Sequence, residues 1–436
     1  MILNINKGVT VLICLILCMF SKKLTKKWIN PLSVFSGIWT VILFLSILGL
    51  NGLKTANYNT YYIICAGVIS FAVGYLLTYK SKVFFSFNKK RTFTDGKYVL
   101  QYQIIYILGI ICIVYFAIKL LSVVSLYLSG NGLAAIRVLA QSEGAATTSG
   151  GKLINAVRVL IIMPYAYAII PITAMEIWFG KKNKKILFIC FAIIALRVLS
   201  EGGRISIIYF ALHLLIGFSF LESYGKAMQD IAKKIRRNRK KLKIGVFLLV
   251  IILIIASLSR SVSSLTTVTY YYFSMQPYMQ EVWSQIVDEA HLIGYGVGSF
   301  NGFIFPFLYL FKNILGIPFP THFNQIYNMI LATDSQWQII SSYHTRANAY
   351  VGTFWYFYLD GRVIGVILLS FLYGVMGGRL YSKAKRHTNV RSVCVYSFYM
   401  QSIILSFSGF AFSSMFYGIA FLFIIFVAYK KEGKYR

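Results

Sequence analysis

The chain has 436 residues, of which 58% are apolar and only 13% charged, with a net charge of +32 and a mean hydropathy of +0.68. This composition excludes an ordinary soluble globular domain. Apolar runs of about 17 to 25 residues, enough to cross a hydrocarbon core, recur along the chain, without the alternation of a membrane β-barrel. We therefore predict an all-α polytopic membrane protein, with residues 1–436 forming a single integral membrane domain.

Taken in chain order, the apolar runs predict about eleven transmembrane helices, within a range of about 10 to 12. Their approximate bounds are 4–20, 32–53, 58–79, 98–128, 153–179, 186–200, 204–222, 244–259, 361–381, 392–408 and 410–429. The first run is followed by the sequence KKLTKK rather than by a small-residue cleavage site, so we predict a retained helix and not a signal peptide.

The basic residues stand in clusters beside the apolar runs. The clusters lie at 22–27, 80–91, 181–185, 233–243, 383–386 and 430–431. Positive residues resist translocation, so these clusters predict cytoplasmic loops, an outer N-terminus and a cytoplasmic C-terminus. Membrane lipids are the partner that they predict, and nucleic acid is excluded because no soluble domain carries them.

The two larger polar loops, 129–152 and 260–350, then fall on the extracytoplasmic side, where we expect any functional site. Residues 291–318 within the second loop are apolar but interrupted by glycine and proline. They predict a re-entrant or interfacial helix. A full crossing stays open as an alternative. It would reverse the predicted orientation of every helix that follows.

Arginine is more frequent than lysine on the predicted outer side, although positive residues should be depleted there. A guanidinium grips phosphate oxygens with two hydrogen bonds, and an arginine at membrane depth tends to face a cavity or a partner. The pattern predicts an anionic, membrane-borne ligand such as a lipid pyrophosphate. The candidate binding residues are Arg137, Arg197, Arg204, Arg260 and Arg346.

Four further residues are candidates for acid–base chemistry: His344, Glu201, Asp360 and Glu143. Structural alternatives stay open for several of these groups. Arg197 has the spacing to pair with Glu201 on one helix face, and Asp360 has the position of a helix cap.

The six cysteines lie in apolar runs without a metal-like spacing, so we predict neither a metal site nor a cofactor.

Three short segments resemble one family. The sequence SEGGR at 200–204 opens a helix, YYYFSMQ occupies 270–276, and Asn348-Ala-Tyr350 leads to Asp360 and Gly365. Over about 190–430 the chain is similar to the bacterial oligosaccharide repeat-unit polymerases, the Wzy-type O-antigen and capsular polysaccharide polymerases, which are distantly similar to O-antigen ligases. Arg362 departs from the glycine that is usual at its position.

This resemblance implies a GT-C-like fold in the bacterial plasma membrane. It implies an enzyme that joins undecaprenyl-pyrophosphate-linked repeat units on the outer face, with a chain-length regulator and a flippase as further partners and without a metal. Arg204, Arg197 and Arg260 would clamp the departing pyrophosphate, and Glu201 would orient one of them.

In the same reading His344 would activate the acceptor hydroxyl, with Glu143 and Asp360 as second choices. Arg137 and Arg346 would bind the phosphates of the second lipid or hold the outer loops. Two other functions stay open: a flippase for lipid-linked sugars and an O-antigen-ligase-like transferase. Because the arginines gather on one predicted side, they favour an enzyme over a flippase, but they do not separate a ligase from a polymerase.

Overall fold

The computed structural model describes residues 2–80, 98–129, 151–201, 205–220, 265–386 and 389–431. Most of this part of the chain is helical. Six of the described helices are long and apolar enough to cross a membrane: Ile5–Thr25, Pro31–Leu48, Tyr58–Tyr79, Tyr102–Leu128, Ile154–Phe179 and Gly352–Arg386. The chain thus has the helices of a multi-pass membrane protein, and the predicted number of eleven stays a prediction.

The helices are α1 (Ile2–Thr25), α2 (Pro31–Leu48), α3 (Tyr58–Lys80), α4 (Tyr102–Leu128), α6 (Gly151–Val157), α7 (Met163–Phe179), α8 (Lys184–Glu201), α9 (Ile205–Phe218), α12 (Leu265–Ser274), α13 (Gln276–Glu289), α14 (Val297–Leu315), α15 (Thr321–Ser335), α16 (Gly352–Arg386), α17 (Val390–Ile404) and α18 (Met415–Phe426). Short helical turns occupy η1 (Leu50–Gly52), η2 (Arg158–Ile162) and η4 (Ala411–Ser413). The strands are β1 (Tyr98–Leu100), β2 (Gln338–Ile339), β3 (Arg346–Ala347) and β4 (Tyr429–Lys431).

Local sequence signals explain several helix ends. Asn30 caps α2 by accepting a hydrogen bond from the Ser33 amide at 2.9 Å, Pro31 occupies the first turn, and Gly49 ends the helix in a left-handed conformation. Asn389 caps α17 in the same way and completes a reciprocal capping box with Ser392.

Two predicted helices are shorter than expected because their ends pair as strands. β1 and β4 form an antiparallel ladder in which Tyr98 is opposite Lys431 and Leu100 is opposite Tyr429. The prediction of helix over 98–128 and 410–429 is therefore wrong at these ends. The chain between α17 and α18 is also mostly non-helical, and this break contributes to the cavity described below.

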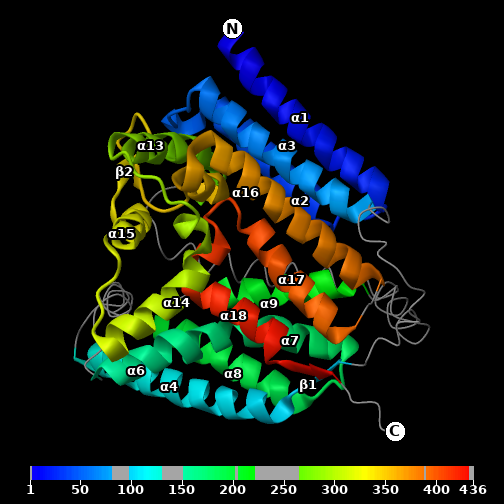
Figure 1. Cartoon of the computed structure of the whole chain (residues 1–436), viewed down its shortest axis with the longest axis vertical. Coiled ribbons are helices and arrows are strands. Elements are labelled where there is room, and N and C mark those ends of the chain that lie inside the picture. Colours follow the sequence, from blue (N-terminus) through cyan, green and yellow to red (C-terminus); the bar gives the residue numbers. More distant parts are fainter. Residues whose placement is uncertain are drawn as a thin grey trace.

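The helices α3 and α16 pack closely through glycines. A Cβ atom on Gly74 would overlap the backbone carbonyl of Phe371, and a Cβ on Gly374 would overlap that of Phe71. Small residues let two helices approach to backbone contact, which is the common device for helix pairs in lipid. In Figure 1 this pair lies in the upper half of the molecule, between α1 and α17.

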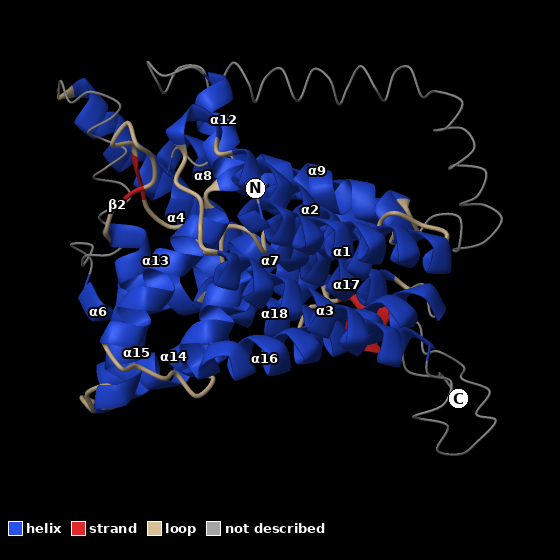
Figure 2. Cartoon of the chain, turned by 90° about the horizontal axis from the view of Figure 1, so that it is seen from above, coloured by secondary structure: helices blue, strands red, loops and turns tan. Residues whose placement is uncertain are grey.

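The described basic clusters lie together at one end of the molecule. Lys27 donates to the Ser219 carbonyl at 2.7 Å, Lys385 donates to the Tyr79 hydroxyl at 3.3 Å, and Lys430 and Lys431 lie on β4, which pairs with β1. The segment from α13 to α15 lies at the opposite end in both views (Figures 1 and 2). The predicted cytoplasmic clusters and the predicted outer segment are thus separated along the long direction of the helices.

The predicted outer segment has its own apolar core. Trp283 of α13 packs against Trp355 of α16 with their ring centroids 6.2 Å apart, and both side chains are fully buried. Within 291–318 the chain forms α14, which Gly296 precedes in a left-handed conformation. Of the described helices, α14 is not among the six with the length and hydropathy of a span.

Candidate functional site

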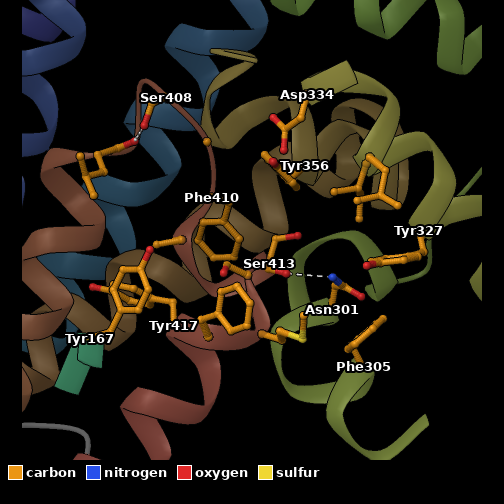
Figure 3. A pocket seen from close by; sticks show the side chains of 18 of the residues that line it. Tyr167, Asn301, Phe305, Tyr327, Asp334, Tyr356, Ser408, Phe410, Ser413 and Tyr417 are labelled. Carbon is orange, nitrogen blue, oxygen red and sulfur yellow. Dashed lines mark hydrogen bonds between the residues drawn. The ribbon is translucent and has the colours of Figure 1, made fainter. Parts of the chain in front are cut away.

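A cavity of about 370 Å³ opens between the segment 297–335 and the apolar helices. Its walls come from α7, α9, α14, α15, α16, α18 and the break between α17 and α18 (Figure 3). A volume of this size lies in the range of small-molecule binding sites. The cavity therefore has room for one or two sugar rings.

The polar lining of the cavity consists mainly of neutral hydrogen-bonding groups. Five tyrosines contribute to it: Tyr167, Tyr209, Tyr327, Tyr356 and Tyr417. Asn301 and the serines Ser408, Ser413 and Ser414 add an amide and hydroxyls. Of the described residues that line the cavity, none carries a positive charge, and Asp334 is the one acidic residue. Such a lining suits a polyhydroxyl ligand better than an anion.

The break between α17 and α18 is held open by hydrogen bonds from neighbouring helices. Thr353 of α16 donates its amide to the Ser406 carbonyl at 2.7 Å and its hydroxyl to the Gly409 carbonyl at 3.1 Å. Asn301 of α14 donates to the Ser413 carbonyl at 2.9 Å, as Figure 3 shows. These hydrogen bonds pair backbone carbonyl groups that have no helical partner in the break. The irregular chain is therefore stable beside the cavity.

Asp334 occupies the last turn of α15 and faces the cavity beside Tyr356 (Figure 3). Asp334 is exposed to solvent at the cavity, but the protein around its carboxyl partly removes that group from water and raises its pKa above its ordinary value. No described residue forms a hydrogen bond or an ion pair with the carboxylate. The negative end of the α15 dipole also disfavours a charge at this position.

Arg197 lies behind the cavity wall formed by Tyr167. The guanidinium is buried, its Nη2 donates to the Tyr167 hydroxyl at 3.2 Å, and its Nε donates to Glu201 at 2.9 Å. Glu201 also accepts from Lys119 of α4 at 3.1 Å. The predicted pairing of Arg197 with Glu201 is thus present, and Tyr167 connects this ionic cluster to the cavity.

The Nη1 atom of Arg197 is buried and has no hydrogen-bond partner among the described residues. An unsatisfied buried donor costs about 1 to 3 kcal/mol, so a stably folded protein rarely keeps one without a reason. This donor is a candidate contact for an oxygen of a bound ligand.

We expect Arg197→Met to lower the free energy of unfolding by about 2 kcal/mol. Removing one partner leaves Glu201 half-paired at a mostly buried position, although Lys119 remains beside it. The double variant Arg197→Met/Glu201→Gln should regain part of the loss, which a double-mutant cycle by thermal unfolding in detergent would measure. Strictly additive losses would show that the two groups do not stabilise each other.

Asp360 contacts the N-terminus of α14 with both carboxylate oxygens. Oδ1 accepts from the Gly298 amide at 2.7 Å and Oδ2 accepts from the Ser299 amide at 2.8 Å. It lies directly before a kink at Gly361 and Arg362 that divides α16 into two helical segments, so the second segment begins close to the predicted helix start. The predicted helix cap is therefore present, but the helix that Asp360 caps is α14.

His344 and Arg346 lie on the exposed hairpin that β2 and β3 form, where Gln338 pairs with Ala347. Neither side chain is among the residues that line the cavity. The remaining predicted site residues, Arg137, Glu143, Arg204 and Arg260, lie outside the described residues.

Several residues of the cavity were not singled out from the sequence. Asp334 belongs to the few acidic residues of the predicted outer segment, but nothing in its neighbourhood distinguishes it from Asp288 or Glu289. Lys119 is the clearest sequence signal of the ionic cluster behind the cavity. It lies in the middle of a long apolar run, where an isolated charge needs a partner. The cavity tyrosines come from distant segments and are not distinguishable from an interfacial belt by sequence.

The described residues contain no group of three or more histidine, cysteine, aspartate or glutamate side chains that could hold a metal ion. Comparisons with protein-family models, with curated proteins and with solved structures found no match.

Proposed function

We propose that the chain is a membrane glycosyltransferase that polymerises undecaprenyl-pyrophosphate-linked oligosaccharide repeat units into O-antigen, capsular polysaccharide or exopolysaccharide. The reaction would take place on the outer face of the bacterial plasma membrane, with a GT-C-like arrangement of helices. The growing chain would be the donor, and a new lipid-linked unit would supply the attacking hydroxyl. The cavity lined by tyrosines, with one unpaired carboxylate and a buried guanidinium behind its wall, carries this proposal.

The position of the cavity supports an enzyme with its site on one side of the membrane. Two walls come from α14 and α15 of the segment 260–350, which the basic clusters predict to be outside. Lys27, Lys385 and Arg391 lie at the other end of the helices. A flippase would need a polar path between the two ends, whereas the cavity adjoins the outer segment.

The chemistry of the lining supports separate places for sugar and phosphate. Neutral hydroxyl and amide groups in the cavity would bind a sugar. The pyrophosphate would lie where arginines are available, near Arg197 at the end of α8. Arg204, three residues after Glu201, is predicted to complete the clamp together with Arg260. Arg137 and Arg346 remain predicted contacts of the second lipid.

The test is a glycan gel from the host. With the gene deleted, we expect single lipid-linked repeat units to accumulate on the outer side, and the wild-type gene should restore a ladder of polymer. Arg204→Ala should fail to restore the ladder although the protein is present in the membrane. Arg386→Ala, at an exposed position in the predicted cytoplasmic loop, is the matched control and should restore it.

Other outcomes would replace the proposal. Repeat units that accumulate facing the cytoplasm would identify a transporter. Polymer of normal length that is no longer attached to its final acceptor would identify a ligase-like transferase. A full ladder from Arg204→Ala would remove this residue from the pyrophosphate clamp.

A further inference from the structure

We propose that Asp334 is the catalytic base that accepts the proton of the attacking sugar hydroxyl. This inference rests on the proposed polymerase function and names a residue that the family resemblance did not indicate. It places the acceptor sugar in the cavity between α14, α15 and the break that precedes α18.

The first support is the position of the carboxylate. Asp334 is the one carboxylate among the described residues that line the cavity, and Figure 3 shows it at one end beside Tyr356, with Tyr327 and Asn301 farther along the same cavity. A sugar bound in this cavity would share it with this one carboxylate. His344, which the sequence favoured for this role, lies on the hairpin and does not line the cavity.

The second support is that the Asp334 carboxylate forms no hydrogen bond or ion pair with a described residue. Residues 348 and 349 bind the backbone of this turn instead: the Ala349 amide donates to the Thr333 carbonyl at 2.7 Å, and the Asn348 side chain donates to the Asp334 carbonyl. Of the other described acidic residues near this end, Glu289 is exposed and does not line the cavity, and two have partners. Asp288 pairs with Arg362 at 2.7 Å, and Glu281 accepts from the Asn57 side chain at 2.6 Å.

The third support is electrostatic. Surrounding protein and the end of the α15 dipole both disfavour the charged form of Asp334, so its affinity for a proton is higher than that of a free aspartate. A general base works best when its pKa approaches the working pH.

In the proposed step the oxygen of the acceptor hydroxyl forms a bond to the anomeric carbon of the donor sugar. The bond from this carbon to the phosphate oxygen breaks, and lipid pyrophosphate leaves with the electron pair. The hydroxyl proton moves to a carboxylate oxygen of Asp334, which later releases it to water. No oxidant, reductant or further co-reactant is needed.

Asp334→Asn keeps the shape of the side chain and removes the base. With purified protein in liposomes and the lipid-linked repeat unit of the host, we expect kcat to fall by about 100-fold or more, with KM changed little. Asp334→Glu should regain part of the rate. Glu289→Gln is the matched control, because Glu289 is an exposed carboxylate of the same outer segment that does not line the cavity.

The pH profile separates a base from a binding residue. The rate of the wild type should fall as the pH drops through the pKa of Asp334, at a value above the roughly 3.9 of a free aspartate. Asp334→Asn should lack this limb. The ionisable groups that face the cavity from every described wall are Tyr327, Tyr356, Tyr167, Tyr209 and Tyr417. The hairpin beside the end of α15 carries Tyr350, with Arg346 and His344 exposed.

A stability measurement distinguishes loss of chemistry from loss of fold. Since Asp334→Asn removes an unpaired charge from a helix C-terminus, its melting temperature should equal or exceed that of the wild type. Retention of more than half of the wild-type kcat would overturn the assignment and leave the polymerase function intact. If the wild-type protein forms no polymer from the lipid-linked unit, both the assignment of Asp334 and the proposed polymerase function are contradicted.

Discussion

Gly374→Leu is expected to lower the free energy of unfolding by about 3 kcal/mol or more, the upper end of the cost of overpacking. A Cβ at this position would overlap the carbonyl oxygen of Phe71, which belongs to the backbone of α3 and cannot rotate away. Gly74 makes the reciprocal contact with the carbonyl of Phe371. The two helices would therefore have to separate, which affects every element packed on them.

The measurement is thermal unfolding of the purified protein in detergent. Gly8→Leu is the matched control, because nothing lies within 4 Å of a Cβ atom built on Gly8 of α1. The control should unfold close to the wild-type temperature. Equal behaviour of both variants would show that α3 and α16 do not depend on backbone contact.

Asp360→Ala is expected to lower the free energy of unfolding by about 3 kcal/mol. The carboxylate accepts hydrogen bonds from the Gly298 and Ser299 amides, and each bond to a charged group contributes about 1.5 to 3 kcal/mol. The N-terminus of α14 would lose its cap, and Asn301, one turn further on, would lose its fixed position in the cavity. Polymer formation should decline together with stability.

Two substitutions calibrate this result. Asp360→Asn keeps one acceptor oxygen and should have an intermediate effect. Asp288→Asn removes a partly exposed ion pair with Arg362, which is worth only about 0 to 1 kcal/mol. Wild-type stability combined with complete loss of polymer in Asp360→Ala would instead assign Asp360 a direct part in the reaction, as the family resemblance suggested.

Much of the architecture could be predicted because its signals are local. A run of apolar residues long enough to cross a bilayer must form a helix, since lipid offers no partner for backbone groups. The spans Tyr58–Tyr79 and Ile154–Phe179 match the predicted 58–79 and 153–179, whereas the first helix ends five residues later and the second five residues earlier than predicted. The clusters of lysine and arginine likewise predict which helix ends lie together, and the described clusters do lie together at one end.

The candidate site depends on contacts between distant segments, and only the tertiary structure decided it. Asp360 is a helix cap, but the amides that it binds lie more than sixty residues earlier in the chain. Asp334 differs from its acidic neighbours in its surroundings: it lines the cavity, and the protein around its carboxyl raises the pKa of this group. The sequence by itself determined a multi-pass helical membrane protein with its charge at one end, because hydropathy and charge act residue by residue. The cavity, and the carboxylate within it, came from packing, because packing depends on all the neighbours at once.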